Sequence, residues 1–103
     1  MPLPNGYGKL ISGLNSTPQF VRINEENRQY FANRIIISNA AGTTNVRAVL
    51  NCANAADFAA LSGNALVVKN GWSLEIIGDG FPPITTIGLS SPDGACDVII
   101  NAY

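Results

Sequence analysis

The stretch "RIIISNAAGTTNVRAVLN", Arg34 to Asn51, decides the fold class of this chain. Two runs rich in β-branched and aliphatic residues flank a short segment of small and polar residues. β-branched side chains favour strands, whereas small polar residues favour turns. The stretch therefore predicts two strands that a turn joins into a hairpin.

The chain downstream of Phe20 continues the same pattern of short extended runs. They read "FVRI" (20–23), "ALVV" (65–68), "WSLEIIG" (72–78), "ITTIGLS" (84–90) and "CDVIINAY" (96–103). Turn signals separate them, such as Asn70-Gly71 and "SPDGA" (91–95), and the latter predicts that the last two runs pair. Many short strands without a long amphipathic helix predict an all-β fold, an antiparallel β-sandwich or jelly-roll-like domain.

One Ala-rich segment, "NAADFAALSGN" (54–64), interrupts the strands. Asn54 can cap a helix, and Asp57 is favourable in its first turn. We expect at most one short helix near Asn54–Leu61. Phe58 and Leu61 are three residues apart and are predicted to face the core.

The first 19 residues differ from the rest, with three of the six prolines and three of the ten glycines. No periodicity persists there, so the sequence predicts an extended N-terminal arm (1–19) followed by a β-sandwich domain (20–103). Such an arm is mobile in isolation and can lie along a neighbouring molecule. Its predicted contact residues are the apolar ones: Leu3, Tyr7, Leu10, Ile11 and Leu14.

The composition excludes several classes of function. A chain of 103 residues is one domain, and its net charge of −1 comes from only 13% charged residues. There is no basic run for a nucleic acid and no window of ~20 apolar residues for a membrane. The N-terminus lacks the apolar region of a secretory signal, which predicts synthesis in a cytoplasm. Low surface charge suits a protein that neighbouring subunits largely cover.

The sequence also offers no enzymatic chemistry. It contains no histidine, the commonest general base and metal ligand. Its carboxylates occur in turns, in polar segments, in the predicted helix or singly within strands, so no facing pair stands out. Cys52 and Cys96 belong to no CxxC pair and are predicted to be free thiols. We therefore expect no catalytic residues, no metal and no cofactor.

Alternation along the strands separates a core face from a second face. The residues of one parity are all apolar: Ile35, Ile37, Val46, Ala48, Leu50, Leu74, Ile76, Val98 and Ile100. The opposite parity mixes polar residues with four aliphatics, Ile36, Val49, Ile77 and Ile99. Three explanations remain open, namely that the chain covers both faces itself, that a bulge shifts the register, or that these aliphatics meet another subunit. Trp72 follows a turn and is added to the candidate interface residues.

The region from Arg34 to Tyr103 resembles small bacteriophage virion proteins of the capsid decoration (cement) and head-fibre kind. The similarity rests on the order "RIIISN", returning strand, small-residue connection "NAADFAALSGNA", "LVVKNGWSLEI" and the closing "ITTIGLSSPDGACDVIINAY". Relatives often have Pro-Gly before the "SLEI"-type strand, where this chain has Asn70-Gly71-Trp72. The N-terminal arm matches no such pattern.

The resemblance implies a non-enzymatic decoration protein on the capsid surface of a virion, made in the host cytoplasm. Its implied partners are the major capsid protein and copies of itself, as a homo-oligomer such as a trimer. Two alternatives remain, a carbohydrate-binding β-sandwich at a receptor-binding tip and a structural component of a tail or baseplate. The carbohydrate-binding alternative predicts that Trp72 and tyrosines gather on one exposed face.

Overall fold

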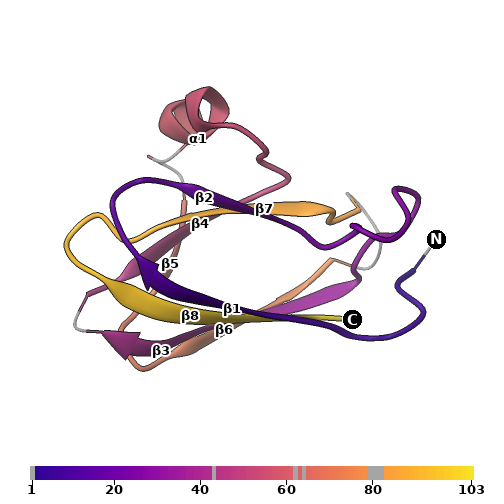
Figure 1. Cartoon of the computed structure of the whole chain (residues 1–103), viewed down its shortest axis with the longest axis horizontal. Coiled ribbons are helices and arrows are strands. Elements are labelled where there is room, and N and C mark those ends of the chain that lie inside the picture. The colour runs from indigo at the N-terminus through magenta and orange to yellow at the C-terminus, as the bar shows by residue number, and fades with distance from the viewer. Residues whose placement is uncertain (1, 43, 62, 64, 79–82) are drawn as a thin grey trace.

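The structure is a computed structural model that describes residues 2–42, 44–61, 63, 65–78 and 83–103, with only the backbone described at Ala41 and Gly42. Two sheets pack together and a short helix lies outside them in the described part of the chain (Figure 1). The elements are β1 (Tyr7–Leu14), β2 (Gln19–Arg22), β3 (Arg34–Gly42), β4 (Val46–Leu50), α1 (Ala55–Leu61), β5 (Leu66–Val68), β6 (Ser73–Ile77), β7 (Thr86–Ser90) and β8 (Cys96–Ala102).

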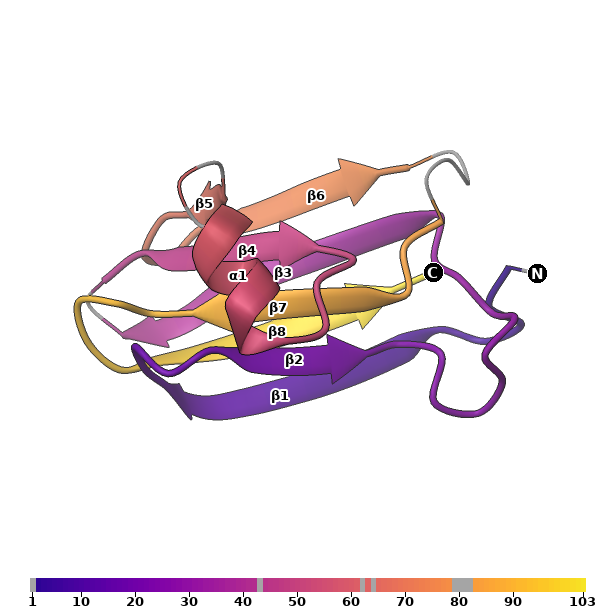
Figure 2. The same cartoon turned by 90° about the horizontal axis from the view of Figure 1, so that it is seen from above.

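Both sheets have four antiparallel strands. One has the order β1-β8-β3-β6, here the β1 sheet, and the other has the order β2-β7-β4-β5, here the β2 sheet. The two sheets pack face to face, and α1 lies over the outer side of the β2 sheet (Figures 1 and 2). This interleaved order is that of a jelly roll. The prediction of an all-β sandwich with one short helix is confirmed.

The predicted hairpins are wrong. β3 belongs to the β1 sheet and β4 to the β2 sheet, so the chain crosses between sheets after "RIIISN". β7 and β8 likewise lie in opposite sheets, although a turn joins them. Among the described strands, β4 and β5 are the consecutive pair that hydrogen-bonds directly. A strand with one apolar face can bury that face against either sheet, so local alternation does not determine its partner.

Asn39 holds the crossing between β3 and β4 in place. Its side chain is 1% exposed, and its Nδ2 donates to the carbonyl oxygens of Thr44 (2.8 Å) and Val68 (3.2 Å). These bonds join β3 to the start of the returning segment and to β5 in the other sheet. A buried amide that satisfies two backbone acceptors favours this crossing over a simple hairpin.

The predicted separation of a 1–19 arm from the sandwich is also wrong. Tyr7 to Leu14 form β1, which pairs with β8 from Tyr7↔Ala102 to Leu14↔Cys96. The ladder shifts register between Ile11 and Leu14, where Gly13 adopts a φ of +66° and its N–H donates to Asp97 Oδ1 (2.9 Å). All three prolines of the segment lie outside β1, so they flank the edge strand without breaking it.

The core lies between the two sheets. Six of the predicted core residues, Ile35, Ile37, Val46, Ala48, Val98 and Ile100, are fully buried. The remaining three, Leu50, Leu74 and Ile76, are partly buried against the same cluster. The alternation pattern therefore predicted the core face correctly.

Helix α1 forms as the sequence predicts. Asn54 Oδ1 accepts a hydrogen bond from the Asp57 N–H (2.8 Å), which is the geometry of an N-cap. Phe58 is buried and meets the Phe20 ring edge-to-face, with the centroids 6.3 Å apart. Leu61 is 47% exposed, contrary to the prediction that it faces the core. No helix in the described part of the chain is long and apolar enough to cross a membrane.

Candidate interaction surface and end cavity

The outer face of the β1 sheet carries the surplus aliphatic residues. Its side chains alternate with the buried ones along β1, β8, β3 and β6. We define this outer face by Leu10, Arg34, Ile36, Ser38, Ser73, Glu75, Ile77, Asp97, Ile99, Asn101 and Tyr103. In the described residues no other element covers it, whereas α1 covers the opposite side of the sandwich (Figure 1).

Strand register brings apolar side chains of the outer face together. Leu10 on β1 lies opposite Ile99 on β8, and Ile99 lies opposite Ser38 on β3. Leu10 is 60% exposed, Ile99 37% and Ile77 64%. Ile36, opposite Asn101 and Glu75, is half-buried in the middle of the face. Neighbouring exposed aliphatics of this kind are typical of surfaces that contact another protein.

The polar groups of the outer face largely pair with one another. Arg34 donates from Nε (3.0 Å) and Nη2 (2.7 Å) to Glu75 Oε2. The same guanidinium lies 5.4 Å from the centroid of the Tyr103 ring. The hydroxyls of Ser38 and Ser73 are 2.9 Å apart. Covering this face would therefore desolvate few unpaired charges.

The ten predicted interface residues differ in where the structure places them. Four of them, Leu10, Ile36, Ile77 and Ile99, lie on the outer face. Ile11 (5% exposed) and Leu14 (0%) instead belong to the core, because β1 is part of the sheet. Val49 is 9% exposed and packs with Cys52 and Phe58, so the chain's own helix covers it.

The remaining three predicted interface residues have other surroundings. Leu3 and Tyr7 are half-buried and pack against the core of their own chain. Trp72 is 64% exposed, but it lies in the β5–β6 turn with Lys69 Nζ 5.2 Å from its ring centroid. Trp72 and the tyrosines do not gather on one face, because Tyr7 and Tyr30 line a cavity and Tyr103 lies against Arg34.

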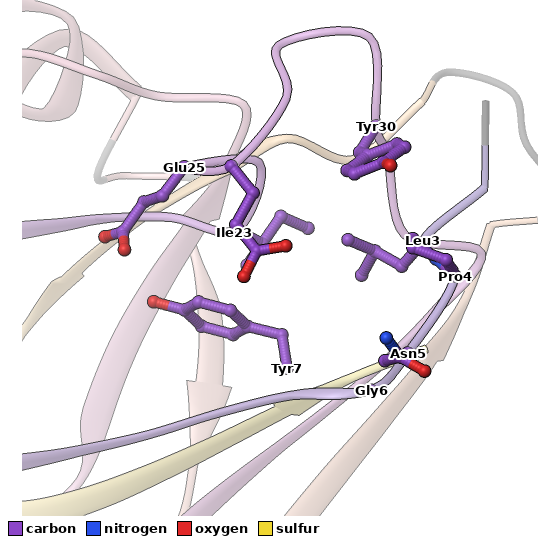
Figure 3. A pocket seen from close by; sticks show the side chains of 9 residues that line it. Leu3, Pro4, Asn5, Gly6, Tyr7, Ile23, Glu25 and Tyr30 are labelled. Carbon is purple, nitrogen blue, oxygen red and sulfur yellow. The ribbon is translucent and has the colours of Figure 1, made fainter.

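A cavity of about 130 Å³ opens at the end of the sandwich where the N-terminal segment meets the β2–β3 connection. Figure 3 shows the side chains of Leu3, Tyr7, Ile23 and Tyr30 around it, with the Glu25 carboxylate toward the Tyr7 hydroxyl. Burial raises the pKa of Tyr7, and the negative charge of Glu25 raises it further. The cavity thus combines aromatic and apolar walls with acidic groups.

Sequence reasoning missed this cavity because it depends on a distant backbone contact. Pro2 forms a parallel bridge with Phe31, and the Leu3 N–H donates to the Phe31 carbonyl (3.1 Å). These contacts hold residues 3–7 over the β2–β3 connection. The prolines predict that the N-terminal segment is extended, but they do not predict that it contacts Phe31.

The described residues contain no group of three or more His, Cys, Asp or Glu side chains placed to hold a metal ion. Cys52 and Cys96 are free and buried, as predicted. Ser91 Oγ and Thr44 Oγ1 each lie 3.3 Å from Cys96 Sγ. Burial alone raises the pKa of the Cys96 thiol, but these hydroxyls favour the thiolate more and bring the pKa below its usual value. The contacts join the β3–β4 connection to β8.

No protein-family model matches the sequence, and no curated protein is significantly similar to it. Several solved structures resemble the fold. A de novo designed double-stranded β-helix superposes with a TM-score of 0.51 at 12% identity, covering 96% of this chain and 99% of the design. A cupin-2 domain containing protein from Shewanella frigidimarina gives 0.46 at 8% identity, covering 96% and 71%.

A protein of Bacillus endospore appendages, described as disulfide-linked pili, gives a TM-score of 0.49 at 12% identity and covers 96% of this chain and 86% of that one. At these identities the likeness concerns the fold alone. The designed double-stranded β-helix supports the jelly-roll arrangement of the two sheets. The same fold hosts unrelated functions, so the function must be argued from the surfaces of this chain.

Proposed function

We propose that this chain is a non-enzymatic structural protein that decorates the capsid of a bacteriophage by packing the outer face of its β1 sheet against capsid subunits. The observation that carries the proposal is the uncovered outer face. There Leu10 and Ile99 are exposed opposite one another, Ile77 is exposed farther along the same face, and the Arg34–Glu75 pair is satisfied within the chain.

Several properties of the chain support a role in binding. Its interior is filled by aliphatic side chains, and its charged residues are few. Covering exposed apolar surface contributes about 25 cal/mol per Å² before association costs are subtracted. The binding free energies of contacts repeated over a capsid lattice would add up. Each copy therefore needs only a modest interface. The resemblance of Arg34–Tyr103 to decoration and head-fibre proteins points to the same role.

The first test is whether the chain is present in purified particles of the virus that encodes it. Mass spectrometry should detect it at a copy number that matches a capsid symmetry site. A copy number of a few per particle would indicate a tail or baseplate component instead. Absence from the particles would refute a virion role.

The second test is rebinding of the purified chain to particles that lack it, measured by co-sedimentation. A Leu10→Glu, Ile99→Glu double variant should fail to bind, because both charges would be desolvated in the contact. Leu61→Glu is the matched control, since Leu61 is an exposed aliphatic on α1, over the other sheet. Equal binding of the two variants would exclude the outer face.

The end cavity favours a second candidate function, the binding of a saccharide. Tyr7 and Tyr30 offer aromatic surface, and Asn5 and Glu25 offer polar groups of the kind that hydrogen-bond hydroxyls. Glycan-array binding that Tyr30→Ala abolishes and Trp72→Ala leaves intact would support it. Binding lost only in Trp72→Ala would place the sugar elsewhere.

A further inference from the structure

The four strands at the edges of the two sheets differ in how open they are to pairing. β2 has four residues and β5 has three, so neither offers a long ladder. β1 is longer, but it has the irregularity at Gly13, and Lys9 shares the inward parity of Ile11. Bulges and inward-pointing charges are devices that protect an edge from pairing. β6 has five residues, no bulge and no inward-pointing charge, and its register with β3 is unbroken from Ser73 to Ile77.

The backbone of β6 presents hydrogen-bonding groups at this edge. The Asn39 N–H donates to the Trp72 carbonyl (2.9 Å), and the Gly78 N–H donates to the Asn33 carbonyl (2.7 Å). In an antiparallel ladder the direction of these groups alternates along the strand. The N–H and C=O groups of Ser73, Glu75 and Ile77 therefore point away from β3 and toward the open side.

The core is also incompletely covered on this side. Ile35 and Ile37 on β3 are fully buried, whereas Leu74 and Ile76, which face the same core from β6, remain partly exposed. A groove of about 190 Å³ lies beside Leu74 between the edges of the two sheets. Four exposed apolar side chains surround this side of the molecule: Leu66, Val67, Trp72 and Ile77.

We propose that β6 pairs in antiparallel fashion with β6 of a second copy of this chain, which forms a two-fold symmetric dimer with a continuous eight-stranded sheet. The same open edge on every copy makes an isologous contact self-complementary. Pairing of β6 with the β1 edge of a second copy is disfavoured, because the irregularity at Gly13 and the charge of Lys9 protect that edge. The contact runs along the edge of β6, whose residues Ser73, Glu75 and Ile77 also border the outer face, and it holds whether or not the capsid role is correct.

Charge and area are compatible with a second copy as the occupant. Arg34 binds the Glu75 carboxylate within each chain, so the two copies do not bring uncompensated like charges together. The exposed apolar side chains on this side offer on the order of 400 Å² per copy, and the strand backbones add to this. Two copies thus approach the ~1,000 Å² that a specific interface needs.

The test compares two substitutions of one residue by sedimentation velocity over a range of concentrations of the full chain. Glu75→Ala removes the carboxylate but keeps the N–H, and it should leave the dimer intact. Glu75→Pro also removes the outward N–H, which an edge strand tolerates. It should raise the dimer dissociation constant roughly 10- to 100-fold, because each dimer loses two hydrogen bonds at its centre. Circular dichroism checks that both variants are folded.

Two further variants keep the test decisive if Glu75→Pro unfolds. Trp72→Glu places a charge beside the groove and should also weaken the dimer, because the charge would be desolvated in the contact; the Trp72 side chain is 64% exposed and lies outside the core. Leu10→Glu, on β1 at the opposite edge of the sheet from β6, should leave the dimer unchanged. A wild-type chain that stays monomeric, or a dimer that Leu10→Glu dissociates while Trp72→Glu does not, would overturn the proposal. If Leu10→Glu loses capsid binding but still dimerises, the result supports both proposals, because this variant changes the outer face and leaves the β6 edge intact.

Discussion

Two adjacent residues of β1 provide a sharp test of whether the N-terminal segment belongs to the folded domain. Ile11 is 5% exposed and lies in the core, whereas Leu10 is 60% exposed on the outer face. We expect Ile11→Ala to destabilise the protein strongly and Leu10→Ala to destabilise it slightly. A mobile arm would predict no effect of either substitution on stability.

The magnitudes follow from burial. Truncation of a buried Ile to Ala removes transfer free energy and leaves a cavity, which together cost about 2–4 kcal/mol. Leu10 has lost less than half of its exposure on folding, so Leu10→Ala should cost about 1 kcal/mol or less. In a domain of this size the Ile11→Ala variant should unfold roughly 10–20 °C below the wild type.

Equilibrium unfolding in urea, followed by circular dichroism, measures both variants against the wild type. The midpoints should differ while the slopes stay the same, because the surface exposed on unfolding hardly changes. If Ile11→Ala is as stable as Leu10→Ala, within about 0.5 kcal/mol, then β1 is not part of the cooperative core. The assignment of Tyr7–Leu14 to the β1 sheet would then fail.

Three other predictions concern single sites. Gly88→Val should lower the free energy of unfolding, measured in urea, by about 1–3 kcal/mol, because a Cβ there would lie 2.9 Å from Phe58 Cδ2. Gly63→Ala should leave it unchanged, because there is open space around Gly63. Cys52 and Cys96 should resist alkylation in the native chain, and both should be alkylated after non-reducing denaturation; a loss of two hydrogens without alkylation would reveal a disulfide. The raised pKa of Tyr7 means that the folded state holds the phenolic proton more tightly than the unfolded state does. The protonated phenol therefore favours the folded state below about pH 10, and this contribution to stability is lost as the pH rises above that value. Tyr7→Phe should reduce the loss of stability at alkaline pH.

The jelly-roll fold is compatible with the proposed capsid role without requiring it. Jelly rolls occur in viral capsid proteins, lectins and cupins, which share an architecture and differ in their surfaces. In this chain the interior is aliphatic, and among the described residues the outer face of the β1 sheet and the edge of β6 are two uncovered surfaces. Function is therefore argued from surfaces that other protein chains would cover.

The sequence by itself determined the fold class, the core face and the helix. Alternation in "RIIIS" and "CDVII" places Ile35, Ile37, Val98 and Ile100 on one side of their strands whatever the pairing. Asn54 and Asp57 specify the start of α1 through local hydrogen bonds. These features depend on residues close together in the chain, so one sequence is enough to predict them.

Only the tertiary structure decided which strands pair and which aliphatics remain exposed. β3 pairs with β8 and β6, not with β4, because a strand's apolar face can be buried against either sheet and the choice depends on distant partners. Val49 and Ile99 share the same alternation signal, but α1 covers Val49, whereas Ile99 stays on the outer face. Ile11 and Leu14 are buried because β8, more than 80 residues later in the chain, pairs with β1. Burial of this kind results from long-range packing, which local periodicity does not encode.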